Sequence, residues 1–297
     1  MSGLLSLRGM SRKTLDGLLD RAQSFVGANH PVLGPHAGAT VATVFFEPST
    51  RTRLSFEKAA HHLGCHVMSL SPEHSSTTKG ESLKDTILTL TAMGTDLLVI
   101  RHWLADAADL AAEWSGRPVV NAGVGRREHP TQTLIDALTL RQRFGRLDGL
   151  RMAVVGDIRN SRVARGILAG LPTLGVELTL VGPTPFLPVT DPWGVRRTTD
   201  LDDELGDQDV IYLLRVQRER GAVLPSEAGY ARHFGMNRDR LSMLKPGAVV
   251  MHPGPINRGL EIDDFVADSE RSLILDQVAN GVPVRMAVLS AGLEGLK

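Results

Sequence analysis

The sequence predicts an α/β protein with two doubly wound domains on parallel sheets, joined by interdomain helices. Short apolar runs alternate with helix-period segments along most of the 297 residues. The chain is long enough for two domains that each bury a core. Two long helical patterns, residues 131–144 and 276–296, would connect the domains. We expect the first domain over residues 1–133, with a helix at about 278–297 packing back on it, and the second over 134–277.

The predicted strands are short and continuously apolar, which is typical of parallel strands buried on both faces. They cover residues 41–46, 65–70, 96–100, 118–121, 151–155, 177–181, 209–214 and 248–251. After the first strand, Phe56, Ala59, Ala60 and Leu63 recur at helical spacing and Gly64 ends the segment. A helix therefore follows directly on a strand.

Composition excludes several classes of protein. The 33 Lys and Arg residues balance the 33 Asp and Glu residues, so no global field favours nucleic acid or an anionic membrane as a partner. One cysteine excludes an intrachain disulfide and fits a reducing compartment. No apolar segment has membrane-spanning length, and no export signal opens the chain, so we expect a cytoplasmic protein.

The turn between the first strand and its helix reads Ser49-Thr50-Arg51-Thr52-Arg53. The first backbone N–H groups of a helix lack internal partners and attract anions, and hydroxyl and guanidinium groups can complete a phosphate cage. Ordinary capping explains one hydroxyl. Capping does not explain the two arginines at the positive end of the helix dipole, where cations are unfavourable without an anion. The motif therefore predicts an anion site.

Polar residues also follow the other predicted strands. In open α/β sheets, ligands bind outside the carboxyl ends of the strands. The segments at those ends are Arg101-His102 and residues 122–133, 156–162, 215–218 and 252–259. Each alone is typical of a solvated loop, but together they predict that guanidinium and hydroxyl groups far apart in the chain meet in one ligand-binding cleft.

Other sites are disfavoured. Gly156-Asp157 follows a strand as in a dinucleotide-binding unit, but the Gly-x-Gly-x-x-Gly pattern is missing, and so is the nucleotide loop that ends in Gly-Lys-Ser/Thr. No carboxylate or histidine cluster favours a catalytic metal, and no cofactor is expected. Cys65 is expected to be a buried small apolar residue. Residues 202–204, all acidic, predict a solvated helix start.

Three motifs carry a family resemblance: Ser49-Thr50-Arg51-Thr52-Arg53, His129-Pro130-Thr131-Gln132-Thr133 and His252-Pro253-Gly254-Pro255. In order and separation they resemble the aspartate/ornithine carbamoyltransferase family, through nearly the whole chain, and within it the members that act on aspartate. The resemblance implies a transferase of pyrimidine biosynthesis that carbamoylates the α-amino group of L-aspartate. It also implies carbamoyl phosphate mainly in the first domain, the amino acid mainly in the second, and a homotrimer with shared active sites.

By resemblance, four residues hold the phosphate of carbamoyl phosphate: Ser49, Thr50, Arg51 and Thr52. Arg101 and His129 join Thr52 at the carbonyl oxygen. The carbamoyl amino group is oriented by Gln132 and by the backbone carbonyls of Pro253, Gly254 and Pro255. The catalytic residues implied are Arg51, Thr52, Arg101 and His129.

The second substrate carries two carboxylates, which planar arginine forks match in a bidentate manner. Arg162 and Arg215 stand at two strand ends of the second domain, and Gln217 follows. By resemblance these three residues bind aspartate. Ser75 and Lys79 match a loop that reaches the active site of a neighbouring subunit, where Lys79 contacts aspartate.

Two alternatives remain open: a carbamoyltransferase for another amine such as ornithine, and a non-catalytic family member that acts as a binding partner. The ornithine enzymes typically carry His-Cys-Leu-Pro where this chain has His252-Pro253-Gly254-Pro255. Gly254 stands where the family frequently has Leu, in a Pro-Leu-Pro sequence. An extra glycine is expected to make this loop more flexible. Val163 stands where some relatives have Thr. A regulatory chain, or dihydroorotase, is left open as a partner.

Overall fold

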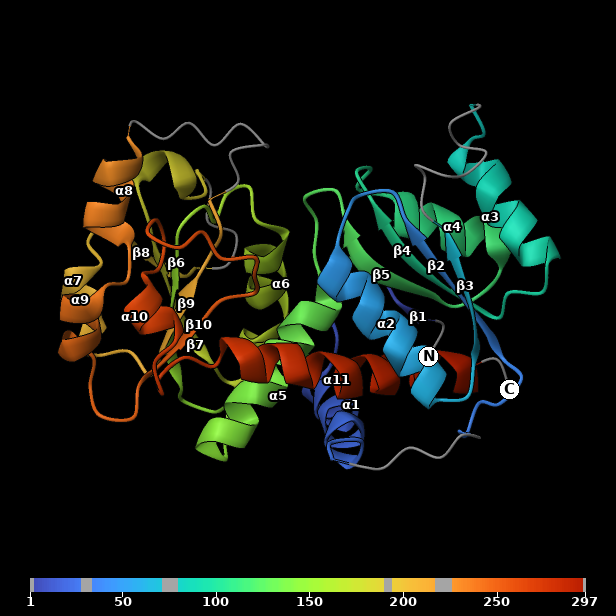
Figure 1. Ribbon diagram of the computed structural model, residues 1–297, viewed down its shortest axis with the longest axis horizontal. Coiled ribbons are helices and arrows are strands. Elements are labelled where there is room, and N and C mark those ends of the chain that lie inside the picture. Colours follow the sequence, from blue (N-terminus) through green and yellow to red (C-terminus); the bar gives the residue numbers. More distant parts are fainter. Residues whose placement is uncertain (1–2, 28–33, 71–79, 190–193, 217–225, 296–297) are drawn as a thin grey trace. The chain divides into compact units, whose positions relative to one another are not determined.

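The computed structural model describes residues 3–27, 34–70, 80–189, 194–216 and 226–295. The chain divides into two compact units (Figure 1). The first comprises Met1–Leu138 and Val278–Lys297, and the second comprises Thr139–Gln277. The two divisions fall inside helices α5 (Pro130–Phe144) and α11 (Ile274–Glu294).

The first unit contains a five-stranded parallel sheet with the strand order β1-β5-β4-β2-β3. Its strands are β1 (Gly3–Leu4), β2 (Thr40–Phe45), β3 (His66–Leu70), β4 (Leu97–His102) and β5 (Val119–Val124). The helices that lie wholly within it are α1 (Arg12–Ser24), α2 (Thr50–His62), α3 (Leu83–Ala92) and α4 (Ala107–Ser115).

Both faces of this sheet are covered. On one face, Ala42, Val44, Leu98 and Ile100 form a buried cluster with side chains of α3 and α4. The alternate residues point to the other face, where α11 comes so close that a Cβ on Gly292 would lie 2.7 Å from Leu97. A two-sided core is why these strands read as continuous apolar runs.

The second unit repeats the architecture with the strand order β10-β9-β6-β7-β8, again all parallel. Its strands are β6 (Arg151–Val155), β7 (Glu177–Val181), β8 (Arg196–Thr198), β9 (Val210–Leu213) and β10 (Val249–Met251). Its helices are α6 (Arg162–Gly170), α7 (Asp202–Leu205), α8 (Glu227–Phe234), α9 (Arg238–Met243) and α10 (Asp264–Ala267), with 3-10 turns η3 (Pro172–Leu174) and η4 (Thr184–Phe186). A buried cluster packs Tyr230, Phe234 and Val266 of α8 and α10 against one face of the sheet.

The predicted fold class is confirmed: each unit is an α/β layer structure on a parallel sheet. The eight predicted strands all form, within a few residues of their expected bounds. Two further strands, β1 and β8, were not predicted, because they are two and three residues long and β8 has no apolar run. None of the described helices has the length and hydropathy needed to cross a membrane.

Candidate functional site

In the first unit, the carboxyl ends of β2, β4 and β5 lie side by side at the centre of the sheet. Phe45 pairs with Arg101, and His102 pairs with Val124. The segment after β2 is hydrogen-bonded to β4 at this edge, because the N–H of Phe46 donates to the carbonyl of Arg101 at 2.8 Å. The predicted polar segments after these strands therefore meet at one edge, as expected for a parallel sheet.

The N-terminus of α2 differs from the other described helix starts that have a serine at the N-cap. Ser11, Ser82, Ser161 and Ser226 cap α1, α3, α6 and α8, and each hydroxyl accepts the N–H three residues ahead. Ser49 occupies the same position before α2, but its side chain forms no capping hydrogen bond. Capping therefore does not account for this hydroxyl, and the helix end keeps the donors that an anion would use.

The two arginines of this motif have different surroundings. The guanidinium of Arg53 pairs with Glu57 one turn later, with Nε 3.7 Å from Oε1. Arg51 is exposed in part, and the desolvation it does experience lowers the pKa of its guanidinium. A bound anion would oppose that shift by favouring the charged form. Thr52 is buried at the same turn, so one exposed arginine and one buried hydroxyl stand beside Ser49.

Arg101 is the last residue but one of β4, and its side chain contacts both neighbouring segments. Its Nη1 donates to the carbonyl of Ala122, in β5, at 3.2 Å. On the other side, its Nε lies 3.9 Å from a carboxylate oxygen of Glu47, two residues before Ser49. The guanidinium therefore lies between the β5 strand and the turn that leads into α2.

His129 and Gln132 belong to the start of α5. His129 is buried, and its carbonyl accepts the N–H of Gln132 at 2.9 Å, which begins the helix behind Pro130. The preceding Glu128 is also buried; it accepts the Ser6 hydroxyl at 2.7 Å and the Leu7 N–H at 2.9 Å. This carboxylate ties the N-terminal segment to the residue before His129.

In the second unit, β10, β9 and β6 present their carboxyl ends next to one another. Met251 pairs with Tyr212, and Val155 pairs with Leu213. Arg215 follows β9 by two residues and is half-buried, whereas Arg162 opens α6 and is buried. The structure therefore places both predicted arginines after neighbouring strands of one sheet edge.

The segment after β10 is held by buried polar contacts. Glu261 accepts the backbone N–H of Asn257 at 2.6 Å and lies 3.2 Å from Nε2 of His252. The N–H of Gly254 donates to Nδ1 of His252 at 2.8 Å. Gly254 has φ +67°, a left-handed conformation that favours glycine. Glycine therefore suits this turn, and residues 252–257 form a fixed loop around one carboxylate.

Three predicted site residues lie outside the described part of the chain: Ser75, Lys79 and Gln217. Among the described residues, no group of three His, Cys, Asp or Glu side chains could hold a metal ion.

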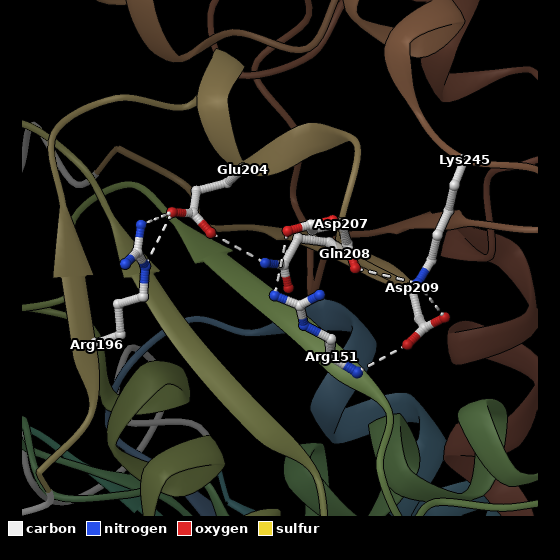
Figure 2. Close-up of polar contacts among 7 residues, drawn as sticks. All are labelled: Arg151, Arg196, Glu204, Asp207, Gln208, Asp209 and Lys245. Carbon is white, nitrogen blue, oxygen red and sulfur yellow. Dashed lines mark hydrogen bonds and ion pairs between the residues drawn. The ribbon is translucent and has the colours of Figure 1, made fainter.

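A second polar cluster lies at the opposite edge of the second sheet, where β6 and β9 begin (Figure 2). Glu204 accepts two hydrogen bonds from Arg196 and one from Gln208, and Lys245 lies 2.8 Å from Asp209. The prediction of a solvated helix start was wrong for Glu204, which is buried because Arg196 and Gln208 satisfy its carboxylate. This cluster pairs its charges internally and lies away from the carboxyl ends of the strands, the edge at which open α/β sheets generally bind ligands.

Sequence reasoning missed three buried carboxylates beside the predicted site residues: Glu128, Asp136 and Glu261. Asp136 accepts a hydrogen bond from Nε2 of Gln132 at 2.9 Å. The i, i+4 spacing of Gln132 and Asp136 on the predicted helix was a usable signal for Asp136. For Glu261, nine residues after His252, local periodicity offered no such signal.

Comparison with known proteins identifies the family of this chain. Residues 3–142 match a family model described as the carbamoyl-P binding domain of aspartate/ornithine carbamoyltransferase, and residues 148–291 match the Asp/Orn binding domain. The chain is 49% identical over 301 residues to an aspartate carbamoyltransferase catalytic subunit of Thermobifida fusca, covering 99% of this chain and 96% of that protein. It is 50% identical over 301 residues to the corresponding subunit of Salinispora arenicola, with 98% of each chain covered.

Solved structures of carbamoyltransferases share the fold of this chain. Aspartate transcarbamoylase from Trypanosoma cruzi, in complex with N-(phosphonacetyl)-L-aspartic acid, matches with a TM-score of 0.89 and 33% identity, covering 97% of this chain and 94% of the other. Ornithine carbamoyltransferase from Thermus thermophilus matches with a TM-score of 0.87 and 28% identity over 99% of both chains. The fold is thus shared by enzymes with different acceptors. With both domain models matched and half of its residues identical to those of relatives along nearly its whole length, the chain belongs to the aspartate/ornithine carbamoyltransferase family.

Proposed function

We propose that this protein transfers the carbamoyl group of carbamoyl phosphate to the α-amino group of L-aspartate, which gives N-carbamoyl-L-aspartate and phosphate. The observation that carries the proposal is the 49–50% identity, over nearly the whole chain, to catalytic subunits named for this reaction. The reaction is an early step of pyrimidine biosynthesis.

Carbamoyl phosphate binds at the carboxyl edge of the first sheet in this proposal. Its phosphate takes the helix N-terminus of α2, with the hydroxyls of Ser49, Thr50 and Thr52 and the guanidinium of Arg51. The uncapped Ser49 supports this assignment, because its hydroxyl is not used within the helix. The two negative charges of the phosphate also suit a helix end that carries the cationic Arg51.

The carbonyl oxygen of the same substrate lies against Thr52, Arg101 and His129. The α-amino group of aspartate attacks the carbonyl carbon, a tetrahedral intermediate forms, and phosphate leaves with the electron pair of the C–O bond. Each donor at the developing oxyanion contributes about 3 kcal/mol of transition-state stabilisation. His129 acts as a donor, and the departing phosphate accepts the proton of the amine.

The carbamoyl amino group donates to acceptors. These are the side-chain oxygen of Gln132 and the backbone carbonyls of Pro253, Gly254 and Pro255. The contacts of His252 and Glu261 support a fixed position for that loop.

Aspartate is the preferred acceptor because its two carboxylates match arginine forks. Arg162 and Arg215 bind them, together with Gln217 and Lys79. Ornithine carries a side-chain ammonium group, which two arginines would repel. The absence of cysteine from His252-Pro253-Gly254-Pro255 supports the same choice.

We further propose a cytoplasmic homotrimer in which Ser75 and Lys79 reach the active site of a neighbouring subunit. The family resemblance of the loop that carries them supports this assembly. Native mass measurement of the purified protein tests it, and a mass of 32.1 kDa would contradict it.

An acceptor panel tests the activity. Purified protein is incubated with labelled carbamoyl phosphate and with L-aspartate, L-ornithine or other amines in turn. Labelled N-carbamoyl-L-aspartate is the expected product. Preferential labelling of ornithine or another amine would show that the acceptor is not aspartate. Tight binding of carbamoyl phosphate without turnover would show that the protein is a non-catalytic family member that acts as a binding partner.

A further inference from the structure

One amide–carboxylate pair in the first unit lies beside the proposed carbamoyl site. Nε2 of Gln132 donates to Oδ1 of Asp136 at 2.9 Å, one helical turn away on α5. Asp136 is fully buried and Gln132 is 9% exposed. The neighbouring residues Leu134, Ile135, Ala137 and Leu138 are buried and apolar. Burying a carboxylate among apolar side chains costs free energy, so its hydrogen-bond partners must offset that cost.

The contact decides which way the Gln132 amide faces. The oxygen and nitrogen of an amide have nearly the same shape, so packing alone selects neither orientation. A carboxylate accepts the amide N–H and repels the amide oxygen, so Asp136 engages the nitrogen. The oxygen of the same planar group then lies on the side away from Asp136, as an acceptor.

We propose that Asp136 is a positioning residue that holds Gln132 as a hydrogen-bond acceptor, and that the pair thereby selects carbamoyl phosphate over acyl phosphates. This inference rests on the proposed function, in which Gln132 meets the carbamoyl amino group. That group donates two N–H bonds, whereas acetyl phosphate carries a methyl group in its place. When the Gln132 oxygen is held in place, it accepts a hydrogen bond from the amino group of carbamoyl phosphate. Against the methyl group of acetyl phosphate the same oxygen has no donor, which disfavours binding of that ligand.

The chain offers a matched pair for comparison. Nε2 of Gln208 donates to Oε2 of Glu204 at 3.1 Å, also four residues apart and also buried (Figure 2). Glu204 additionally binds Arg196, and the pair lies where the strands of the second sheet begin. It has the chemistry of the Gln132–Asp136 pair without a place at a ligand-binding edge.

The experiment uses Asp136→Asn in the full-length protein. Asparagine keeps the size of the side chain but can donate or accept, so the Gln132 amide is no longer held in one orientation. Isothermal titration gives the Kd of carbamoyl phosphate, and competition gives the Kd of acetyl phosphate. We expect the preference for carbamoyl phosphate to fall by about tenfold, with acetyl phosphate bound within about threefold of wild type.

Three controls separate positioning from folding. Glu204→Gln should lower the urea midpoint of unfolding without changing the preference. Gln132→Met, which keeps the volume but removes the amide, should lower the preference by itself and remains informative if Asp136→Asn does not fold. Adding Asp136→Asn to Gln132→Met should then cause no further loss of preference.

Equal weakening of both ligands in Asp136→Asn would overturn the inference, because it would show a structural role alone. An unchanged preference in Gln132→Met would overturn it as well. The proposed function is tested separately by turnover of the wild-type protein with aspartate, since the binding measurements require no acceptor.

Discussion

Nε2 of His252 lies 3.2 Å from Oε1 of Glu261, and both side chains are completely buried. Because Nδ1 of the same ring accepts the N–H of Gly254, the proton of the neutral imidazole is on Nε2 and faces the carboxylate. Glu261 also accepts the backbone and side-chain N–H groups of Asn257, at 2.6 and 3.2 Å. One carboxylate thus holds both ends of the loop from His252 to Asn257.

Glu261→Gln should destabilise the protein and loosen this loop. The substitution replaces a charged acceptor by a neutral amide, which weakens the hydrogen bonds from His252 and Asn257 and costs about 1–3 kcal/mol in a buried site. Urea unfolding measures the loss, and the KM for carbamoyl phosphate should rise. The exposed Glu113→Gln is the control and should stay within about 0.5 kcal/mol of wild type. An unchanged unfolding midpoint for Glu261→Gln would contradict the role given to this carboxylate.

Arg51 and Arg53 should behave differently when each is replaced by alanine. Arg51→Ala removes the guanidinium proposed to bind the phosphate, and we expect kcat/KM to fall by about 10²–10³-fold. Arg53 pairs with Glu57 on the surface of α2, so Arg53→Ala should change kcat/KM by less than about threefold. Steady-state kinetics with carbamoyl phosphate as the varied substrate makes the comparison. Near-normal turnover in Arg51→Ala would refute the phosphate site.

Arg215→Ala should act on the second substrate alone. Loss of one arginine–carboxylate contact costs about 2–5 kcal/mol when the partner charge is left unpaired, so the KM for aspartate should rise by at least about 30-fold. The Kd of carbamoyl phosphate without aspartate should not change. Arg232→Ala, an exposed arginine of α8, is the control and should leave both constants unaltered. A comparable loss of carbamoyl phosphate binding in Arg215→Ala would count against the assignment.

Cys65 should make folding stability depend on pH in the alkaline range. Burial raises the pKa of its thiol from 9.0 to about 11, and the charge of Asp96 adds to the rise. Between these values the unfolded chain loses the thiol proton while the folded chain keeps it, so stability falls as the pH rises. Urea midpoints at pH 8 and pH 10.5 should therefore diverge more for wild type than for Cys65→Ala. Equal losses in the two proteins would show that the thiol does not contribute.

Much of the architecture was predictable because its physical cause is local. Parallel strands covered on both faces must be apolar along their length, and β2, β4, β6 and β9 have that pattern. The strands β1 and β8 were missed, since two or three residues held by neighbouring strands carry no pattern of their own. The meeting of the polar segments at one edge of each sheet was also predictable, because parallel strands all end on the same side.

The sequence by itself determined the fold class, the family motifs and the residue types at the strand ends. Only the tertiary structure decided how those residues are used: that Ser49 leaves its helix uncapped, that Arg53 pairs with Glu57 and that Glu261 holds His252. The reason is physical. Hydrophobic periodicity is set by neighbours along the chain, whereas a charged or polar side chain is satisfied by whichever partner the packed structure brings within about 3 Å.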